Sequence, residues 1–462
     1  MNIAESASLA IAARERGWDE AESADEADVV LLNTCSVRET AEQRVRGRLA
    51  HYASQKKKGK RSFSLILAGC MAERLGENLK KDFPALDFVI GTTDRSLFPF
   101  ILESLEHDAE KAGAGDSASL NIIEKHKFSF SSLHHDVASK EGGASSFRSF
   151  VPIMHGCNNF CTYCIVPYVR GREISRNPNE ILEEIRVLGE RGVREITLLG
   201  QNVNSYLWEG KGGKGKVDFP SLLELIAENL SAGNNTGSGI AVSEVGDGSD
   251  TTGVRWVRFL SSHPKDFSPR TIKVIAENSV FCRHIHLCVQ HGSNRVLSAM
   301  NRQYTREQYM ALVSNLRSSI DDISLSTDIM VGFPGETEED FEEILFLMEE
   351  VKFLYSYMYH YNPREGTSAF SLPGRISAEV KRERLSKVIS LQKRHTVEQL
   401  KSRIGKEVTV LIEGISRKNA DELIGRTERD EMVVVSRKAA SLGSFVRLRL
   451  SSLRGNTFRC NG

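Results

Sequence analysis

The sequence predicts an α/β protein in three parts: an amino-terminal doubly wound α/β domain at 1–110, a central partial (βα)6 barrel at 148–393, and a small carboxyl-terminal β-barrel at 394–462. Three observations predict this fold class. Strand and helix patterns alternate twice before residue 110, six apolar runs separated by helical or loop segments follow from Phe150, and short strand patterns end the chain. The length of 462 residues is enough for about three domains.

The amino-terminal part repeats a strand followed by a helix. The apolar run "ADVVLLNTC" ends at Cys35 and precedes the helical pattern "RETAEQRVRGRLAHYASQ", and "SFSLILAGC" ends at Cys70 before "MAERLGENLKK". Consecutive units of this kind form a parallel sheet, and open α/β sheets bind ligands at the carboxyl ends of their strands. We therefore expect both thiols at one edge of the sheet.

The central part follows a Gly- and Ser-rich linker at 111–147, in which "FSFSS" is a candidate short strand. The six predicted strands of the barrel lie in "FVPIMHG", "REITLLGQN", "VRWVRFLSSHP", "HIHLCVQHG", "ISLSTDIMVGF" and "LYSYMYHYN". The Gly- and Ser-rich region 209–253 is a surface insertion. In such barrels the chemistry lies in the loops after the strands, and a cysteine cluster directly follows the first of them.

The carboxyl-terminal part carries the strand candidates "EVTVLIEGIS", "DELIGRTERDEMVVVS" and "FVRLRLSS", spaced as in a small β-barrel. Residues 401–462 contain 13 Lys and Arg against 7 Asp and Glu. Such a local excess of positive charge attracts a nucleic-acid backbone without reading its sequence.

Composition excludes several classes of protein. The formal net charge is zero, no basic segment followed by an apolar run begins the chain, and no stretch approaches 18 consecutive apolar residues, so we expect a cytoplasmic protein that does not enter a membrane. Eight cysteines in a reducing compartment are not expected to form disulfides. A tight cluster of them indicates metal or redox chemistry.

Cys157, Cys161 and Cys164 form that cluster, in the spacing CxxxCxxC. Three thiolates on a four-iron, four-sulfide cubane leave one iron without a protein ligand and open to an exogenous chelate. The alternative is a structural zinc site closed by His155 as the fourth ligand.

Further motifs support the first interpretation. The spacing CxxxCxxC after the first barrel strand resembles that of the radical S-adenosylmethionine superfamily, whose open iron binds the amino and carboxylate groups of S-adenosylmethionine. The segments "LLNTCSVRETAEQRV", "GCNNFCTYCIVPYVRGRE", "LLGQNVNSY", "SSHPKDFS", "VQHGSNRVLSAMNRQYTREQY", "STDIMVGFPGETEEDF" and "YHYNPREGTSA" resemble the methylthiotransferase family within it. The carboxyl-terminal part resembles the TRAM domain, with which those enzymes grip RNA.

The resemblance implies a reaction and its cofactors. An electron delivered to a [4Fe-4S] cluster at Cys157, Cys161 and Cys164 would cleave S-adenosylmethionine to a 5′-deoxyadenosyl radical, which removes hydrogen from carbon 2 of an isopentenylated adenosine. Sulfur enters there, and a second S-adenosylmethionine supplies the methyl group. Cys35 and Cys70 match two of the three cysteines that hold the family's second, auxiliary [4Fe-4S] cluster.

The sequence departs from the family pattern at its start. In the family a first strand ends in the third auxiliary cysteine, followed closely by Met-Asn, whereas this sequence begins with Met1 and Asn2. Two explanations are possible. The start of the protein has been placed at an internal methionine, which we favour, or the auxiliary site lacks one ligand and the amino-terminal domain lacks its first strand. Cys288 stands where the family more often has proline, and we expect a structural role for it.

Four further residues are candidates for binding the cofactor. Tyr163 is expected beside the adenine of S-adenosylmethionine or in simple packing. Gln201 and Asn202 follow the second strand and would meet the cofactor or the base, unless they only shape their loop, and Asp328 is either a cofactor contact or a strand-end cap. Separately, Arg170 and Arg172 would bind phosphate or carboxylate, or else belong to a solvated run.

The expected partner is a tRNA anticodon stem-loop bearing an isopentenylated adenosine at position 37, whose base can be splayed out of a single-stranded loop. We also expect a reductase or flavodoxin-type electron donor and a monomeric enzyme. Three alternatives remain: an enzyme for threonylcarbamoyl-adenosine in tRNA, one for a ribosomal-protein aspartate, and a non-catalytic iron–sulfur protein that binds RNA. "NTCSVRETAE" and "GQNVNSY" favour the isopentenyl-adenosine branch.

Overall fold

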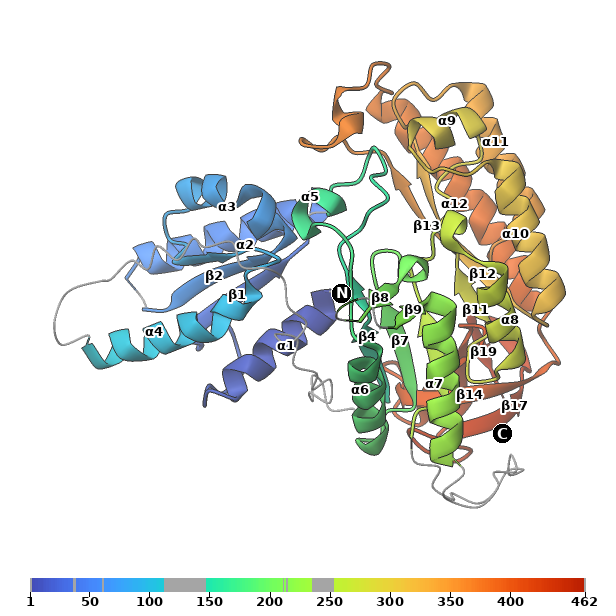
Figure 1. Cartoon of the computed structure of the whole chain (residues 1–462), viewed down its shortest axis with the longest axis horizontal. Helices are drawn as coiled ribbons and strands as arrows, with labels where there is room; N and C mark the ends of the chain where they lie inside the picture. The colour runs from blue at the N-terminus through green and yellow to red at the C-terminus, as the bar shows by residue number, and fades with distance from the viewer. Residues whose placement is uncertain are drawn as a thin grey trace. The chain divides into compact units, whose positions relative to one another are not determined.

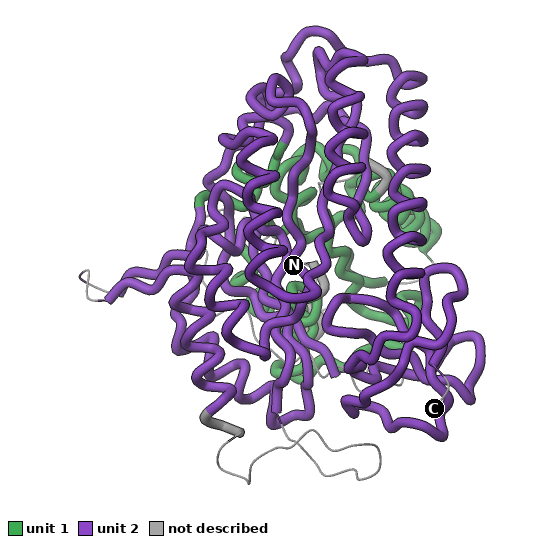
Figure 2. The backbone as a smooth tube through the Cα atoms, turned by 90° about the vertical axis from the view of Figure 1, so that its right-hand side faces the viewer, with its two compact units in different colours: residues 1–139, 164–172 green, residues 140–163, 173–462 purple. Residues whose placement is uncertain are grey.

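The protein was analysed as a computed structural model, which describes residues 2–35, 39–59, 62–111, 147–210, 212, 215–234 and 253–460. The chain forms two compact units (Figure 2). The first contains 1–139 and 164–172, and the second contains 140–163 and 173–462. The predicted strand at "FSFSS" and most of the predicted linker lie outside the described residues, as does much of the insertion predicted at 209–253.

The first unit is built on a parallel sheet of three strands in the order β1-β2-β3 (Figure 1). Its elements are α1 (Asn2–Arg14), β1 (Val29–Thr34), α2 (Glu39–Lys57), β2 (Ser64–Gly69), α3 (Cys70–Asp82), β3 (Phe88–Ile90), the 3-10 turn η1 (Arg95–Leu97), α4 (Phe98–Lys111) and α5 (Val166–Arg170). Successive side chains of a strand point to opposite faces of its sheet. Leu65 and Leu67 accordingly pack with α2 and α3, whereas Ile66 and Ala68 pack with α1 and α4. Helices cover both faces, as the predicted doubly wound arrangement requires.

The second unit contains the predicted partial barrel. Its six parallel strands are β4 (Arg148–Pro152), β7 (Glu195–Leu199), β10 (Trp256–Phe259), β11 (His284–His286), β12 (Ser324–Val331) and β13 (Tyr355–His360). They form two groups of three, ordered β10-β7-β4 and β11-β12-β13. Parallel bridges from Val257 to Phe281 and from Ser262 to Leu287 join the two groups. The strands therefore follow one another in chain order around an open barrel, which confirms the predicted fold class.

Helices cover the outside of these strands (Figure 1). They are α6 (Pro178–Glu190), α7 (Phe219–Asn234), α8 (Pro269–Glu277), α9 (Asn294–Ala299), α10 (Arg306–Ser319), α11 (Glu338–Val351) and α12 (Ala378–Lys401). Capping boxes at Thr305 and Thr337 satisfy the first backbone N–H groups of α10 and α11. The domain boundary predicted at 393/394 falls inside α12. This helix is rich in charge and buries few apolar side chains, so the sequence shows only a weak helical periodicity there.

Shorter elements complete the barrel. Two hairpins pair β5 (Met154–His155) with β6 (Ile174–Ser175), and β8 (Leu207–Glu209) with β9 (Lys216–Asp218). Three 3-10 turns occur at η3 (Val203–Ser205), η5 (Pro264–Asp266) and η6 (Ser368–Ser371).

The carboxyl-terminal module is a sheet of six strands in the order β17-β14-β15-β16-β19-β18. Its strands are β14 (Glu407–Ile415), β15 (Glu422–Thr427), β16 (Met432–Ser436), β17 (Phe445–Arg449), β18 (Ser452–Arg454) and β19 (Thr457–Arg459). The sequence did not predict β18 and β19, which have three residues each and largely polar composition. Val410, Ile412, Val433 and Phe458 form the centre of the module's own core.

The module packs against the amino-terminal ends of the barrel strands. Trp256, the first residue of β10, lies edge-on to Phe445 with 4.9 Å between ring centroids. At the start of β12, Ser324 Oγ donates to the carbonyl of Arg429 at 2.9 Å, and at the start of β13 Tyr355 Oη donates to Asp430 Oδ2 at 2.8 Å. The carboxyl ends of the strands, where the cysteine loop begins, are therefore left uncovered by the module.

One fully buried carboxylate joins barrel and module. Glu195 has no exposed surface, and it accepts hydrogen bonds from Arg148 Nε at 2.6 Å and from Arg258 Nε at 2.8 Å. Arg258 also donates to the carbonyls of Thr427 and Glu428 in the module. Separately, no helix among the described residues is both long and apolar enough to span a membrane.

Replacing Glu195 by alanine should lower the free energy of unfolding of the second unit by about 3 kcal/mol or more, because it leaves buried Arg258 without an anion. Urea unfolding followed by tryptophan fluorescence measures the change. The control is Glu183→Ala, which removes an exposed ion pair with Arg186 and should leave the midpoint unchanged. A Glu195→Ala midpoint equal to that of the wild type would contradict the assignment.

Candidate metal and cofactor site

Cys157 and Cys161 lie in the loop that leaves β5 at the carboxyl end of the barrel. The loop turns tightly because Gly156, at φ 78°, and Phe160, at φ 46°, both adopt left-handed backbone conformations. Such a conformation is uncommon for a residue with a side chain and needs support from its surroundings. Both cysteines are 8% exposed.

The segment after α9 supplies that support. Asn301 Nδ2 donates to the carbonyls of Asn159 at 3.2 Å and Phe160 at 3.1 Å. The N–H of Thr162 donates to the carbonyl of Met300 at 3.1 Å. The cysteine loop is therefore held in one conformation by backbone and side-chain hydrogen bonds.

Glu173 holds the other side of the loop. Its carboxylate accepts from the N–H of Asn158 at 3.1 Å and from Ser205 Oγ at 2.9 Å. The loop is thus fixed from two directions, which suits a site whose ligands must not move.

Both sulfurs are buried, and a hydrogen-bond donor lies near each of them. Burial raises the pKa of the Cys157 thiol to about 11, while a backbone hydrogen bond from Asn159 acts in the opposite direction. Arg302 Nη1 donates to Cys161 Sγ at 3.3 Å. Donors aimed at both sulfurs fit thiolates that carry an iron–sulfur cluster.

Among the described residues, the group of three whose potential metal-ligand atoms lie within 4.8 Å of one another is His286, Cys288 and Asp328. The open cluster at the three cysteines and the zinc site closed by His155 therefore both stay predictions.

Cys164 belongs to the first unit, where it is half-buried just before α5. That unit also contains the other two candidate ligands. Cys35 follows β1 and Cys70 follows β2, and the residues before them, Thr34 and Gly69, are paired in the sheet. The sheet therefore brings both thiols to the same edge, as predicted from the sequence.

A buried charge network lies beside Cys70. Glu5 accepts from Arg170 Nη1 at 2.6 Å and pairs with Arg95 Nη2 at 2.8 Å, and all three side chains are at most 4% exposed. Burial opposes ionisation of Glu5, but the two arginines keep its pKa well below the usual range. Arg170 also interacts electrostatically with Cys70, and this interaction acts against the rise that burial causes in the pKa of the Cys70 thiol. The carboxylate expected for Arg170 is therefore Glu5 of the same chain.

The cofactor candidates differ in their surroundings. Tyr163 is half-buried and packs against an apolar cluster that includes Met300 and Phe333. Gln201 is half-buried, whereas Asn202 is 1% exposed, donates to Asp266 Oδ2 at 2.6 Å and accepts from the N–H of His263. The structure thus favours the loop-bracing alternative for Asn202, because both ends of its amide already bind protein groups.

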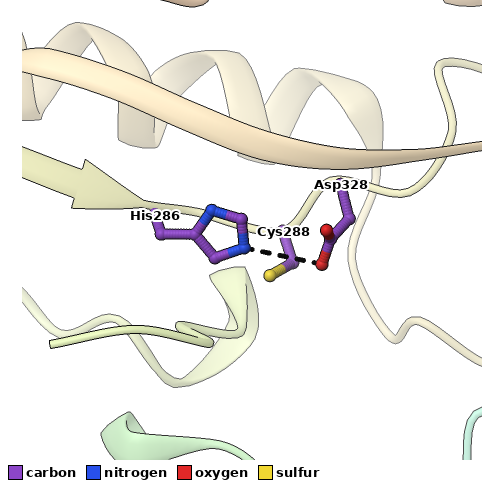
Figure 3. A group of neighbouring side chains, drawn as sticks. All are labelled: His286, Cys288 and Asp328. Carbon is purple, nitrogen blue, oxygen red and sulfur yellow. Dashed lines mark ion pairs between the residues drawn. The ribbon is translucent and has the colours of Figure 1, made fainter. Parts of the chain in front are cut away.

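Asp328 lies with His286 and Cys288 inside the barrel (Figure 3). Its Oδ2 is 3.5 Å from His286 Nε2, and each of the three residues offers one potential metal ligand within 4.8 Å of the others. Burial opposes ionisation of Asp328, but hydrogen bonds from His286 and Cys288 lower its pKa. Its neighbours therefore stabilise Asp328 as a carboxylate.

Sequence reasoning missed several residues that support these sites, among them Asn301, Arg302 and Glu5. Arg302 and Cys161 are 141 positions apart, and Glu5 and Arg170 are 165 apart. The segment "MNRQY" contains Asn301 and Arg302 and was noted for its resemblance, but spacing alone could not show which side chains turn inward.

Three known families match the chain, in the same order along it as the three parts predicted from the sequence. Residues 1–91 match the Uncharacterized protein family UPF0004, 151–348 match the Radical SAM superfamily and 401–458 match the TRAM domain. Among solved structures, the chain is similar to the radical S-adenosylmethionine methyltransferase TsrM from Kitasatospora setae, with cobalamin and a [4Fe-4S] cluster bound. The TM-score is 0.52 at 13% identity, covering 79% of this chain and 73% of that one. This likeness supports the fold.

Curated relatives match the chain over its full length. A tRNA-2-methylthio-N(6)-dimethylallyladenosine synthase of Treponema denticola is 47% identical, covering 100% of this chain and 97% of the relative. The synthase of Bacteroides fragilis is 41% identical, covering 99% of this chain and 93% of the relative. Together with the cysteine loop at the carboxyl end of the barrel, these matches show that the chain belongs to the tRNA-2-methylthio-N(6)-dimethylallyladenosine synthases, a family of radical S-adenosylmethionine enzymes.

Proposed function

We propose that this chain is a tRNA methylthiotransferase that converts N6-dimethylallyladenosine at position 37, next to the anticodon, to its 2-methylthio derivative. The observation that carries the proposal is the braced cysteine loop, in a chain 47% identical to such a synthase along its whole length. The branch acting on threonylcarbamoyl-adenosine is disfavoured, because the relatives described above are named for the dimethylallyl substrate.

Cys157, Cys161 and Cys164 hold the radical-forming [4Fe-4S] cluster. When bound, the cluster supplies the electron that cleaves S-adenosylmethionine to a 5′-deoxyadenosyl radical. The chain's contribution is to fix the ligands: Asn301 and Glu173 hold the loop, and the buried surroundings of Cys157 and Cys161 limit the access of water.

Tyr163, Gln201 and Asp328 contact S-adenosylmethionine or the target base, and Asn202 acts through the loops that it braces. The Asp328 side chain is 23% exposed despite its partners, which is consistent with contact to a ligand's hydroxyl or amino group. Tyr163 is half-buried, which leaves part of its ring available for stacking.

Cys35 and Cys70 hold the auxiliary cluster in the first unit. The guanidinium of Arg170, fixed by Glu5, stabilises negative charge on Cys70 and on sulfur bound near it. The three-ligand pattern of the family needs one more thiolate than these two.

Exposed cations of the carboxyl-terminal module bind the phosphates of the anticodon stem-loop. Arg437 and Lys438 are exposed. They lie beside the turn that follows β14, since the N–H of Arg437 donates to the carbonyl of Asp421 in that turn at 2.8 Å. Arg417 and Lys418, in that turn, are exposed as well. We call these four exposed cations the basic patch.

The proposal also covers the protein's other interactions. The chain acts as a monomer in the cytoplasm, where its tRNA substrate is found. A reductase or flavodoxin-type protein supplies single electrons, because reductive cleavage of S-adenosylmethionine consumes one.

Two cysteine variants should separate two activities. Cys161→Ala should lower 5′-deoxyadenosine formation at least a hundredfold, because the cluster loses a ligand. Cys70→Ala should retain that cleavage and lose methylthiolation. Both products can be quantified by mass spectrometry with a reduced enzyme and an isopentenylated stem-loop.

The matched control for these variants is Cys282→Ala, because Cys282 is buried in an apolar cluster with Trp256 and Leu411. It should retain both activities. If Cys70→Ala lost cleavage as completely as Cys161→Ala did, the two clusters could not be separate sites.

The double variant Arg437→Ala/Lys438→Ala should bind the stem-loop several-fold more weakly. The slope of log K against log salt should become shallower by about 2, one for each lost phosphate contact. Fluorescence anisotropy at several salt concentrations measures both changes. The control is Arg447→Ala, since Arg447 is already paired with Glu407 at 3.3 Å. An unchanged slope in the double variant would place the RNA elsewhere.

A further inference from the structure

Arg302 is a buried cation without a carboxylate partner among the described residues. It is 4% exposed, and no Asp or Glu oxygen of the described chain lies within 4.0 Å of its guanidinium. Other buried arginines of this protein are neutralised, for example Arg258 by Glu195 and Arg170 by Glu5. Because an unpaired buried charge is costly, Arg302 calls for an anion from elsewhere.

Every nitrogen of the Arg302 guanidinium has a defined acceptor. Nε donates to Tyr304 Oη at 3.1 Å, Nη2 donates to the carbonyl of Cys288 at 2.6 Å, and Nη1 donates to Cys161 Sγ at 3.3 Å. The Cys288 acceptor is a neutral carbonyl. The Tyr304 hydroxyl itself donates to the carbonyl of Val289 at 2.6 Å, so it is a neutral phenol. The sulfur of Cys161 is the one acceptor of the three that becomes anionic when it binds a metal.

Asp328 does not serve as this counterion. Its carboxylate pairs with His286, with 3.5 Å between Oδ2 and Nε2 (Figure 3), and accepts a hydrogen bond from Gln290 Nε2 at 3.4 Å. Arg302 contributes to the low pKa of Asp328 only from a longer distance, after the contributions of burial, His286 and Cys288.

The position of Arg302 is coupled to the cysteine loop. Its backbone N–H donates to the carbonyl of Leu297 at 2.9 Å, which ties it to α9. The preceding residue, Asn301, holds the carbonyls of the loop directly. The same short segment therefore fixes both the guanidinium and the loop that carries Cys161.

We infer that Arg302 is the built-in countercharge of the cluster held by Cys157, Cys161 and Cys164, a positioning residue that orients the Cys161 thiolate and raises the reduction potential. A [4Fe-4S] core with charge +2 and three thiolates carries a net charge of about −1, and a one-electron donor takes it to about −2. A fixed positive charge in a medium of low dielectric constant stabilises the more negative state. Arg302 remains protonated throughout, so no proton accompanies the electron.

This role rests on the proposed ligation by the three cysteines, but it does not depend on which tRNA or base is modified. The inference concerns how easily the enzyme accepts an electron. It also explains why an arginine, with several donors in a fixed plane, occupies this place: one group joins sulfur, carbonyl and hydroxyl at once.

The test is a potentiometric titration of the reduced-cluster EPR signal in the iron-loaded full chain. All samples carry Cys35→Ala and Cys70→Ala, so that a second cluster does not contribute to the signal. Arg302→Gln removes the charge and keeps much of the shape, Arg302→Lys keeps the charge, and Tyr304→Phe removes only the hydroxyl that Arg302 contacts. Iron and sulfide per chain, and thermal unfolding by circular dichroism, are measured for each variant.

Arg302→Gln should lower the ratio of reduced to oxidised cluster at a given potential at least tenfold, which equals a midpoint about 59 mV more negative. Arg302→Lys and Tyr304→Phe should stay within about threefold of the parent. A fully iron-loaded Arg302→Gln protein with the parent midpoint would overturn the inference.

If Arg302→Gln does not retain the cluster, Arg302→Lys decides. A loaded Arg302→Lys protein within threefold of the parent supports the countercharge, and a loaded one shifted tenfold or more overturns it. Because the titration contains no RNA, its result is separate from the proposed function. An enzyme that failed to modify the stem-loop while showing these midpoints would contradict the substrate assignment and leave the role of Arg302 standing.

Discussion

The structure depends on one geometric demand: the short loop that carries Cys157 and Cys161 must keep a single conformation. Flexible loops do not meet such a demand, because ordering them at each encounter costs conformational entropy. Here the left-handed Phe160 and the hydrogen bonds from Asn301 fix the loop before any ligand arrives. The barrel strands supply the rigid base, since β5 delivers the loop at their carboxyl ends.

The arrangement of barrel and module follows from the same demand. The carboxyl-terminal module packs on the amino-terminal ends of the strands through Trp256, Ser324 and Tyr355, and leaves the opposite ends for the chemistry. The buried contact between Arg258 and the carbonyls of Thr427 and Glu428 makes barrel and module one packed body. An RNA held by the basic patch must then extend along the barrel to bring its base to the cysteine loop.

The sequence predicted the elements well and the long-range contacts poorly. All six barrel strands and the strands before Cys35 and Cys70 were predicted, because buried parallel strands are continuous apolar runs. The short, polar strands β18 and β19 gave no such signal. The start of the carboxyl-terminal module was predicted too early, because the charged helix α12 lacks a clear apolar period. The cysteine motif could be recognised from its spacing. The roles of Arg302 and Glu5 could not, because their partners are far away in the sequence and no local pattern contains both members of a pair.

We propose a cluster with three cysteine ligands and one open iron. Mössbauer spectroscopy of the 57Fe-loaded chain with Cys35→Ala and Cys70→Ala, before and after addition of S-adenosylmethionine, tests it most directly. One iron in four should change its isomer shift when the cofactor's amino and carboxylate groups bind. Four irons that remain unchanged, or a chain prepared without oxygen that holds one zinc in place of iron and sulfide, would contradict it.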